Sequence, residues 1–223
     1  MIPDGNRRWA KAQGKPATWG HLQGAKQVKE ILKTALDLKI PYFTFWGASV
    51  TNITERSRLE VNFLFKLFQS YFKKLLKSKT LQENEVRVRV LGRWQEFCPE
   101  KLKNTINEMI DKTKHHDKFH LTFLLAYSGT DEMKAAIKKI VKENRNDEIS
   151  DEVIKKNLWT HDLPPVDLVV RTGGEPHWSA GLLMWDVVEA QLYFTETKWP
   201  AFGPDEFKKA LEYYSGTQRR FGK

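Results

Sequence analysis

The first residues that could do chemistry lie at positions 4–8, Asp-Gly-Asn-Arg-Arg. Gly5 permits a tight turn and a close approach of the backbone to a ligand. If a helix begins near Trp9, its N-terminal N–H groups and the Arg8 guanidinium favour an anion there. Asp4 does not suit a pure anion site, but it suits one in which Mg²⁺ is held by a carboxylate and by substrate phosphates. A helix cap beside solvated arginines is the alternative.

A second polar segment, residues 171–179, follows an apolar run at 166–170 and has the sequence Arg-Thr-Gly-Gly-Glu-Pro-His-Trp-Ser. Its paired glycines would let backbone N–H groups approach an anion, and Arg171, His177 and Ser179 are further donors. It is not a Walker loop, because the GxxxxGK[ST] spacing is absent. The alternative is an ordinary polar turn.

A third segment, residues 49–60, carries small polar side chains from Ser49, then Arg56 and Arg58, then Glu60. It could be a mobile loop that closes over a substrate, or a strand-to-helix connection with an ordinary cap. His21 could donate to phosphate or lie partly buried at a helix start.

Two further polar groups have simpler interpretations. No third ligand at metal spacing accompanies His115 and His116, which favours a solvated turn. The C-terminal residues 218–222, Gln-Arg-Arg-Phe-Gly, could be a basic tail or could reach a site.

The elements that must position these groups follow from the apolar pattern. Strand-like runs occur at 41–47, 86–90, 119–127, 166–170 and 191–194. Helical spacing occurs at 21–38, 58–77, 99–113, 131–143, 150–158 and 180–190, and a last helix opens at 203–205. This order predicts an α/β fold with a mostly parallel central sheet surrounded by helices. In such sheets ligands bind beyond the carboxyl ends of the strands, where the polar segments fall.

The composition limits the class of protein. The chain has 223 residues, of which 40% are hydrophobic and 12% aromatic, which excludes a wholly disordered chain. The single Cys98 excludes an internal disulfide and CxxC metal sites, and is typical of a reducing cytosol. Apolar runs fall short of the ~20 residues of a membrane helix. No linker divides residues 1–223, so we expect one domain, and its start so close to a motif predicts that residues precede it.

The charge is strongly basic. Lys and Arg number 37 against 28 Asp and Glu, a formal net charge of +9. A basic surplus predicts anionic partners: nucleic acid, an acidic membrane surface or phosphorylated small molecules. A nucleic-acid-binding module should expose stacking aromatics, whereas the aromatics here fall mostly at periodic positions typical of a core. We therefore expect no nucleic acid among its partners.

Taken together, the motifs resemble the cis-prenyltransferase family, whose best-known member is undecaprenyl diphosphate synthase. The match covers nearly the whole chain. The motifs that carry it occur in the family's order: Asp4-Gly5-Asn6-Arg7-Arg8-Trp9-Ala10, Gly20-His21, Gly24, Ser49, Asn52, Arg171-Thr172-Gly173-Gly174-Glu175, Leu192-Tyr193-Phe194-Thr195, Trp199-Pro200, Phe202 and Arg219-Arg220-Phe221-Gly222.

The resemblance implies a Mg²⁺-dependent enzyme that elongates an allylic diphosphate, such as farnesyl diphosphate, with isopentenyl diphosphate. The new double bonds would be cis and the product a polyprenyl diphosphate. It also implies a cytoplasmic homodimer with a hydrophobic tunnel between sheet and helices, of which residues 42–46 and 58–77 would form walls. Lysines on helix faces could hold such an enzyme at the inner face of an acidic membrane that takes up its product.

Site roles carry over residue by residue from the resemblance. Asp4 would hold Mg²⁺ and diphosphate. Asn52 would assist proton removal from isopentenyl diphosphate. The allylic diphosphate would be bound by Gly5, Asn6, Arg7 and Arg8, with Trp9 adjacent and His21 beside its phosphates. The isopentenyl diphosphate would be bound by Arg171, His177 and Ser179, with Ser49 and Arg56 in the loop that carries Asn52.

The sequence departs from the family at several of these positions. Ala17 stands where an allylic-site arginine is expected, and His177 where an arginine is typical. The second metal carboxylate aligns with Gln191, an amide and so a weaker Mg²⁺ ligand, and Glu189 could substitute if that stretch is extended. An active enzyme and a non-catalytic partner subunit of a heteromeric cis-prenyltransferase therefore both remain open, and the retained Asp4 and Arg171 favour the enzyme.

Overall fold

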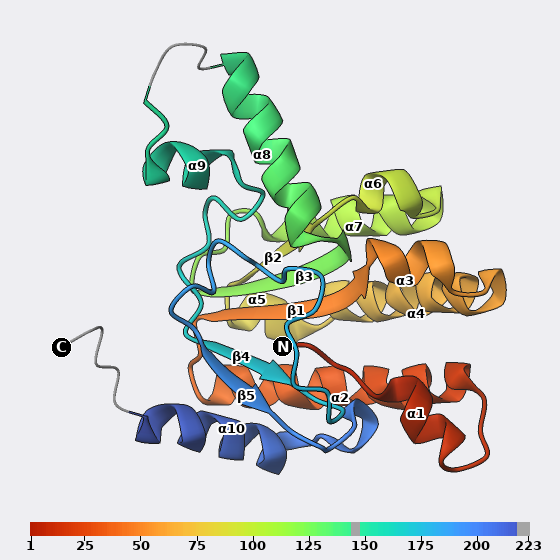
Figure 1. Cartoon of the computed structure of the whole chain (residues 1–223). Helices are drawn as coiled ribbons and strands as arrows, with labels where there is room; N and C mark the ends of the chain where they lie inside the picture. The colour runs from red at the N-terminus through yellow and green to blue at the C-terminus, as the bar shows by residue number, and fades with distance from the viewer. Residues whose placement is uncertain (144–147, 218–223) are drawn as a thin grey trace. The chain divides into compact units, whose positions relative to one another are not determined.

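The structure is a computed structural model that describes residues 1–143 and 148–217 (Figure 1). Its internal contacts distinguish two compact units. Unit 1 comprises Met1–Ile40, Asp167–Pro176 and Ala190–Lys223, and unit 2 comprises Pro41–Val166 and His177–Glu189. Each unit is built from parallel strands and helices, so the expected α/β class is confirmed. The expectation of one continuous domain remains a prediction.

Unit 2 is built on a three-stranded parallel sheet in the order β1-β3-β2. Its strands are β1 (Tyr42–Ser49), β2 (Val86–Leu91) and β3 (Phe119–Tyr127). The central strand β3 is buried along nearly its whole length, which explains its unbroken apolar sequence. The register pairs Tyr42 with His120 and shifts between Trp46 and Ser49, where β1 ends in a polar segment.

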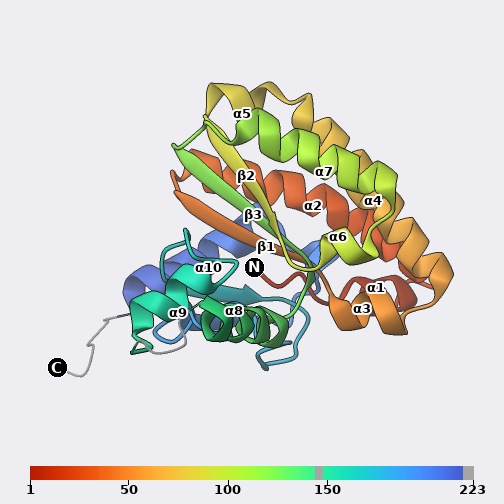
Figure 2. The same cartoon turned by 90° about the horizontal axis from the view of Figure 1, so that it is seen from above.

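Helices lie on both sides of this sheet: in Figure 2 α4 and α7 lie on one side of the strands, and α8 and α9 on the other. Phe72 of α4 is buried against Phe123 of β3, with ring centroids 5.1 Å apart. The helices of unit 2 are α3 (Val50–Glu55), α4 (Arg58–Leu76), α5 (Lys79–Glu83), α6 (Trp94–Phe97), α7 (Glu100–Thr113), α8 (Gly129–Glu143) and α9 (Asp151–Asn157).

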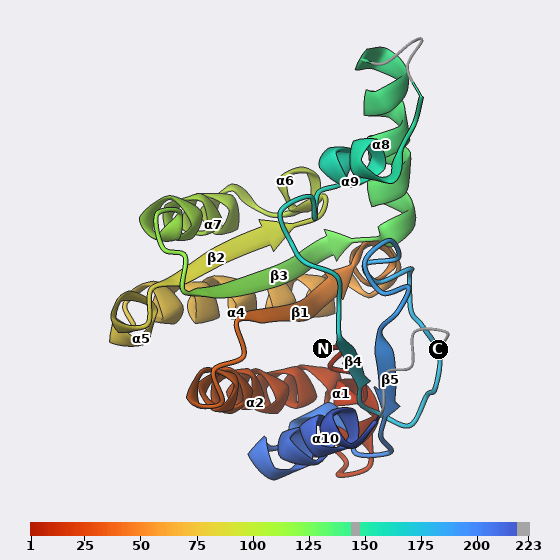
Figure 3. The same ribbon diagram turned by 90° about the vertical axis from the view of Figure 1, so that its left-hand side faces the viewer.

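Unit 1 is built on the parallel pair β4 (Leu168–Arg171) and β5 (Gln191–Phe194). Figure 3 shows these two strands side by side. Helix α10 (Pro204–Gly216) contacts both β5 and α2 (Ala17–Asp37), and the short helix η1 (Trp199–Ala201) packs on α2. The N-terminal segment pairs with β4 through Ile2 and then enters α1 (Asn6–Lys11). The chain start and the segment after β4 are therefore neighbours.

Two of the sequence expectations are wrong. Residues 180–189 form turns instead of a helix, because Ala180, Gly181 and Leu183 have φ values of 45°, 62° and 46°, which no right-handed helix contains. His116 lies buried with its Nδ1 3.1 Å from the Val86 carbonyl oxygen, so it is not a solvated turn residue. Residues 218–222 lie outside the described part of the chain. No helix within 1–143 and 148–217 has the length and apolar character to cross a membrane.

Candidate active site

Asp4 is held at the carboxyl end of β4 by its own backbone. Ile2 N–H donates to the Val170 carbonyl over 2.8 Å, so the chain start extends alongside this strand. The Asp4 carbonyl then accepts hydrogen bonds from Thr172 Oγ1 at 2.8 Å and from the Trp199 N–H at 2.9 Å. Since Thr172 is fully buried, these bonds fix where the Asp4 side chain begins.

Gly5 makes the turn between this segment and α1. Its φ of 99° lies in the left-handed region, and a Cβ there would meet the Lys198 Cβ at 2.9 Å, so only glycine fits. The Gly5 N–H donates to Asp4 Oδ1 over 2.6 Å. Helix α1 starts one residue later, at Asn6, and not near Trp9.

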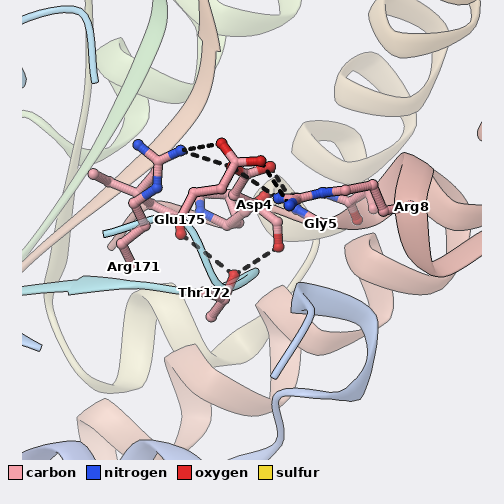
Figure 4. Close-up of polar contacts among 9 residues, drawn as sticks. Asp4, Gly5, Arg8, Arg171, Thr172 and Glu175 are labelled. Atoms are coloured by element: carbon pink, nitrogen blue, oxygen red, sulfur yellow. Dashed lines mark hydrogen bonds and ion pairs between the residues drawn. The ribbon is translucent and has the colours of Figure 1, made fainter. Parts of the chain in front are cut away.

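Two arginines and two carboxylates form one cluster at this turn, as Figure 4 shows. Arg171 Nη2 donates to Asp4 Oδ2 over 2.8 Å and lies 3.6 Å from Glu175 Oε2. Arg8 Nη1 is 2.6 Å from Glu175 Oε1, and its Nη2 is 3.4 Å from Asp4 Oδ2. The formal charges of these four residues balance. We call this set of residues the Asp4–Arg171 cluster.

The cluster has a buried side and an open side. The Arg171 side chain is only 4% exposed, whereas Asp4, Arg8 and Glu175 are 34%, 41% and 47% exposed. Arg171 therefore acts as a fixed, desolvated donor, and the other three side chains can meet a ligand from solvent. Forked guanidinium donors at the carboxyl end of a strand suit the oxygens of a phosphate compound.

The paired glycines do not present their N–H groups to a ligand. Gly173 N–H donates to the Thr197 carbonyl over 3.0 Å, and Gly174 N–H donates to the Thr195 carbonyl over 2.9 Å. The lack of a side chain at Gly173 has another use, since a Cβ there would lie 2.9 Å from Arg8 Nη2. This glycine allows the Arg8 guanidinium to approach the loop after β4.

Asn6 and its neighbours serve the packing of α1 on α2. The Asn6 Nδ2 donates to the Pro3 carbonyl over 3.0 Å, and a Cβ on Gly24 would lie 2.1 Å from the Asn6 Oδ1. Trp9 stacks on Trp19 with ring centroids 4.7 Å apart. Other predicted residues of the allylic site differ in exposure: His21 is buried, and Arg7 is exposed.

The predicted loop after β1 belongs to unit 2 and forms a reciprocal cap on α3. Asn52 N–H donates to Ser49 Oγ over 3.0 Å, and the Ser49 N–H is 3.4 Å from Asn52 Oδ1. The cap interpretation is therefore confirmed for these two residues, and it fixes where the Asn52 amide lies. Arg56 Nη1 lies 3.3 Å from Glu60 Oε1 in the first turn of α4.

The remaining donors of the second polar segment, residues 171–179, also lie in unit 2. His177 is exposed and Ser179 half-buried, both in the irregular segment after Pro176. The structure thus brings Asp4, Gly5, Arg8 and Arg171 together within unit 1. The other predicted site residues lie within unit 2, namely Ser49, Asn52, Arg56, His177 and Ser179.

The second metal position is separate from Asp4 within unit 1. Gln191 opens β5 and pairs with Leu168, whereas Arg171 pairs with Phe194 at the other end of the two strands. Three residues of strand separate the ends, about 10 Å along the sheet. Glu189 lies in a turn before the strand and is exposed, so the extended stretch that would align it with Gln191 is absent.

Asp4 nonetheless suits a Mg²⁺ site in which the phosphates of the substrate supply other ligands. No group of three His, Cys, Asp or Glu side chains among the described residues could hold a metal by itself. Asp4 Oδ1 accepts one hydrogen bond, from the Gly5 N–H, and keeps a further lone pair, whereas Oδ2 faces both Arg171 and Arg8. One carboxylate completed by phosphates and water is a usual Mg²⁺ ligand set.

Two polar groups in the structure, Glu175 and the Tyr127–Glu132 pair, have no role in the sequence-based prediction. Glu175 was part of a motif but had no assigned part, although it contacts both arginines; its spacing four residues after Arg171 was the available signal. In unit 2, buried Tyr127 donates to Glu132, and Glu132 accepts from the Thr160 N–H at 2.9 Å. Burial raises the pKa of Glu132 above its usual range.

A parallel α/β fold with a carboxylate and two arginines at a strand end is an arrangement suited to phosphorylated compounds. Residues 2–222 match the family described as "Putative undecaprenyl diphosphate synthase". The chain belongs to this family, the cis-prenyltransferases, and is by that membership an isoprenyl transferase.

Relatives and solved structures agree with this assignment. A geranylgeranyl-diphosphate-specific tritrans,polycis-undecaprenyl-diphosphate synthase of Thermoplasma volcanium is 36% identical, over all of this chain and 87% of that protein. An isoprenyl transferase of Fusobacterium nucleatum is also 36% identical, over all of this chain and 94% of that protein.

Among solved structures, lavandulyl diphosphate synthase from Lavandula x intermedia, in complex with dimethylallyl diphosphate, is similar with a TM-score of 0.94 and 28% identity. That similarity covers all of this chain and 96% of the other. A probable undecaprenyl diphosphate synthase from Campylobacter jejuni has a TM-score of 0.77 and 28% identity, over 90% of this chain and 92% of that one.

Proposed function

We propose that this chain condenses isopentenyl diphosphate with an allylic diphosphate, forming cis double bonds and a polyprenyl diphosphate. The observation that carries the proposal is the Asp4–Arg171 cluster, in which one carboxylate lies 2.8 Å from a buried arginine and 3.4 Å from an exposed one. Cations fixed at the end of a strand suit a substrate whose reactive group is a diphosphate. The family membership supplies the reaction class.

The roles of the residues follow from charge and exposure. Arg8 binds oxygens of the allylic diphosphate and neutralises the negative charge that develops as this group departs, and Arg171 binds isopentenyl diphosphate. Asp4 holds Mg²⁺, which when bound contributes further charge neutralisation at that leaving group. Gly5 lets α1 begin at Asn6, just after Asp4, and the Gly5 N–H donates to Asp4 Oδ1.

The residues of unit 2 supply the second substrate site in this proposal. Asn52 accepts or relays the proton lost from isopentenyl diphosphate, and its cap with Ser49 holds the amide still. Arg56, His177 and Ser179 bind the isopentenyl diphosphate. The aromatic face between β1, β3 and α4 borders the growing hydrocarbon, with Phe68 closely packed against Gly47.

The proposal is tested by incubating the protein with farnesyl diphosphate and labelled isopentenyl diphosphate, with Mg²⁺ or with a chelator. We expect labelled polyprenyl product with Mg²⁺ and none with the chelator. A protein that binds both substrates yet makes no product with Mg²⁺ is instead the non-catalytic partner subunit. One observation favours this alternative: Gln191, an amide, stands where a metal-binding carboxylate is expected.

We further propose that the chain acts as a cytoplasmic homodimer that contacts an acidic membrane at its inner face. The support for membrane contact is the row of exposed lysines on and after α4, namely Lys73, Lys74, Lys77 and Lys79. Cosedimentation should show stronger binding to anionic vesicles than to neutral ones, and equal binding would refute the contact. Sedimentation velocity should show a species of twice the 26.1 kDa chain mass.

A further inference from the structure

We infer that Glu175 is a built-in competitor for the anion site: its carboxylate occupies the arginines that an incoming diphosphate must bind. This inference rests on the proposed diphosphate site and adds a residue to which no role has been given. Glu175 Oε1 lies 2.6 Å from Arg8 Nη1, and its Oε2 lies 3.6 Å from Arg171 Nη2. One carboxylate therefore spans both guanidinium groups from the solvent side.

The contact geometry is that of an anion bound by the site. A diphosphate oxygen that pairs with Arg8 would take up the donor that Glu175 now uses, because charge-assisted hydrogen bonds share the same short distance range. Asp4 contacts the same two arginines but has a backbone hydrogen bond from Gly5 and a carbonyl fixed by Thr172 and Trp199. Of the two carboxylates, Glu175 is the more exposed.

Displacing Glu175 requires only a rotation of its side chain. The backbone before it is anchored, because the Gly173 and Gly174 N–H groups are bonded to the Thr197 and Thr195 carbonyls. The Glu175 side chain itself is 47% exposed, so it can turn toward the solvent. The cost of displacement includes the loss of the ion pair with Arg8, whose side chain is 41% exposed, and of the longer contact with the buried Arg171.

The consequence is a higher threshold for anion binding. With Glu175 in place the charges of the cluster balance, so a weakly charged anion gains little by entering. A diphosphate, with more negative charge and more oxygens, can replace the carboxylate at Arg8 or at Arg171. Removing the Glu175 charge should therefore strengthen anion binding by roughly fivefold, the range expected for a half-exposed ion pair.

The test is calorimetric titration of inorganic diphosphate, with Mg²⁺, into the full chain and into Glu175→Gln, which keeps the shape of the side chain. Glu196→Gln is the matched control, because Glu196 lies against Gly174 in the neighbouring loop and makes no ion pair with Arg8 or Arg171 among the described residues. We expect about fivefold tighter binding for Glu175→Gln and unchanged binding for Glu196→Gln. Thermal unfolding checks that all three proteins remain folded.

Other outcomes would overturn the inference. Unchanged binding by Glu175→Gln would show that Glu175 does not compete, and weaker binding would show that it positions Arg8 for the ligand. Both results leave the diphosphate site itself intact. If neither the unaltered chain nor Glu175→Gln binds diphosphate, the proposed site fails together with this inference.

Discussion

Arg171 Nη2 lies 2.8 Å from Asp4 Oδ2, although 167 residues separate them in the sequence. Two backbone hydrogen bonds on either side of Arg171, from Ile2 N–H to the Val170 carbonyl and from Thr172 N–H to the Ile2 carbonyl, bring them together. The chain start thereby forms a parallel bridge with β4 at Ile2. The metal-binding carboxylate of the proposed site is thus positioned by the same strand that carries its arginine.

The first prediction concerns the packing that supports α1. A Cβ at position 20 would lie 2.1 Å from the Asn6 carbonyl oxygen, a backbone atom that cannot easily move. Gly20→Ala should therefore lower the free energy of unfolding by about 1–3 kcal/mol. Gly216→Ala is the matched control, because nothing lies within 4 Å of a Cβ there. Urea unfolding should show a lower midpoint for the first variant only, and equal midpoints would contradict the packing described.

The second prediction concerns the cap that holds Asn52. Ser49→Ala removes the oxygen that accepts from the Asn52 N–H and should cost about 1 kcal/mol of stability. It should also lower kcat, because the Asn52 amide loses its fixed position. Ser49→Thr keeps a capping oxygen and should retain both stability and kcat. The prediction is refuted if the two variants behave alike in unfolding and in steady-state kinetics.

The third prediction concerns the hydrocarbon site. The Phe68 ring stacks on Phe72 at 6.1 Å between centroids and lies 3.2 Å from where a Cβ on Gly47 would be. Phe68→Ala should open this aromatic face and shift the product distribution to longer chains. Ile137→Ala, at an exposed position of α8, should leave the distribution unchanged. Chromatography of labelled products measures both, and an unshifted distribution for Phe68→Ala argues against a role for this face.

The fourth prediction uses the buried Tyr127–Glu132 pair. Burial raises the pKa of Glu132, so the folded chain binds this proton more tightly than the unfolded chain, whose Glu pKa is about 4.3. The contribution of Glu132 to stability therefore falls as pH rises from that value through the raised pKa. Glu132→Gln should lack this loss, so its stability relative to the unaltered chain should improve between pH 4 and pH 8. Parallel urea-unfolding profiles across that range would contradict it.

The sequence predicted most of the elements because their patterns are local. The strands at 119–127 and 191–194 were predicted to the residue, since their apolar runs stand between turns. The helix expected at 180–190 is absent for a non-local reason. Leu183 N–H donates to the Tyr127 hydroxyl, 56 residues away, and this bond accompanies a positive φ at Leu183.

The candidate site was predictable only in part. Asp4, Arg8 and Arg171 could be placed together because each lies near the end of a strand or the start of a helix. Glu175 was harder to place, because its spacing four residues after Arg171 does not reveal that it also contacts Arg8. The cap between Ser49 and Asn52 was one of two open interpretations, and three-residue spacing alone could not choose between them.

The central claim is that Asp4, paired with Arg171, serves the chemistry and not merely the fold. Incorporation of labelled isopentenyl diphosphate should be measured for Asp4→Asn and for the matched Asp162→Asn, which removes a carboxylate paired with Arg89 at 2.7 Å outside the cluster. The account predicts that Asp4→Asn loses activity by at least about a thousandfold while remaining folded, roughly 4 kcal/mol of transition-state stabilisation. Asp162→Asn should keep most of its activity. Retained turnover by a folded Asp4→Asn would contradict the account.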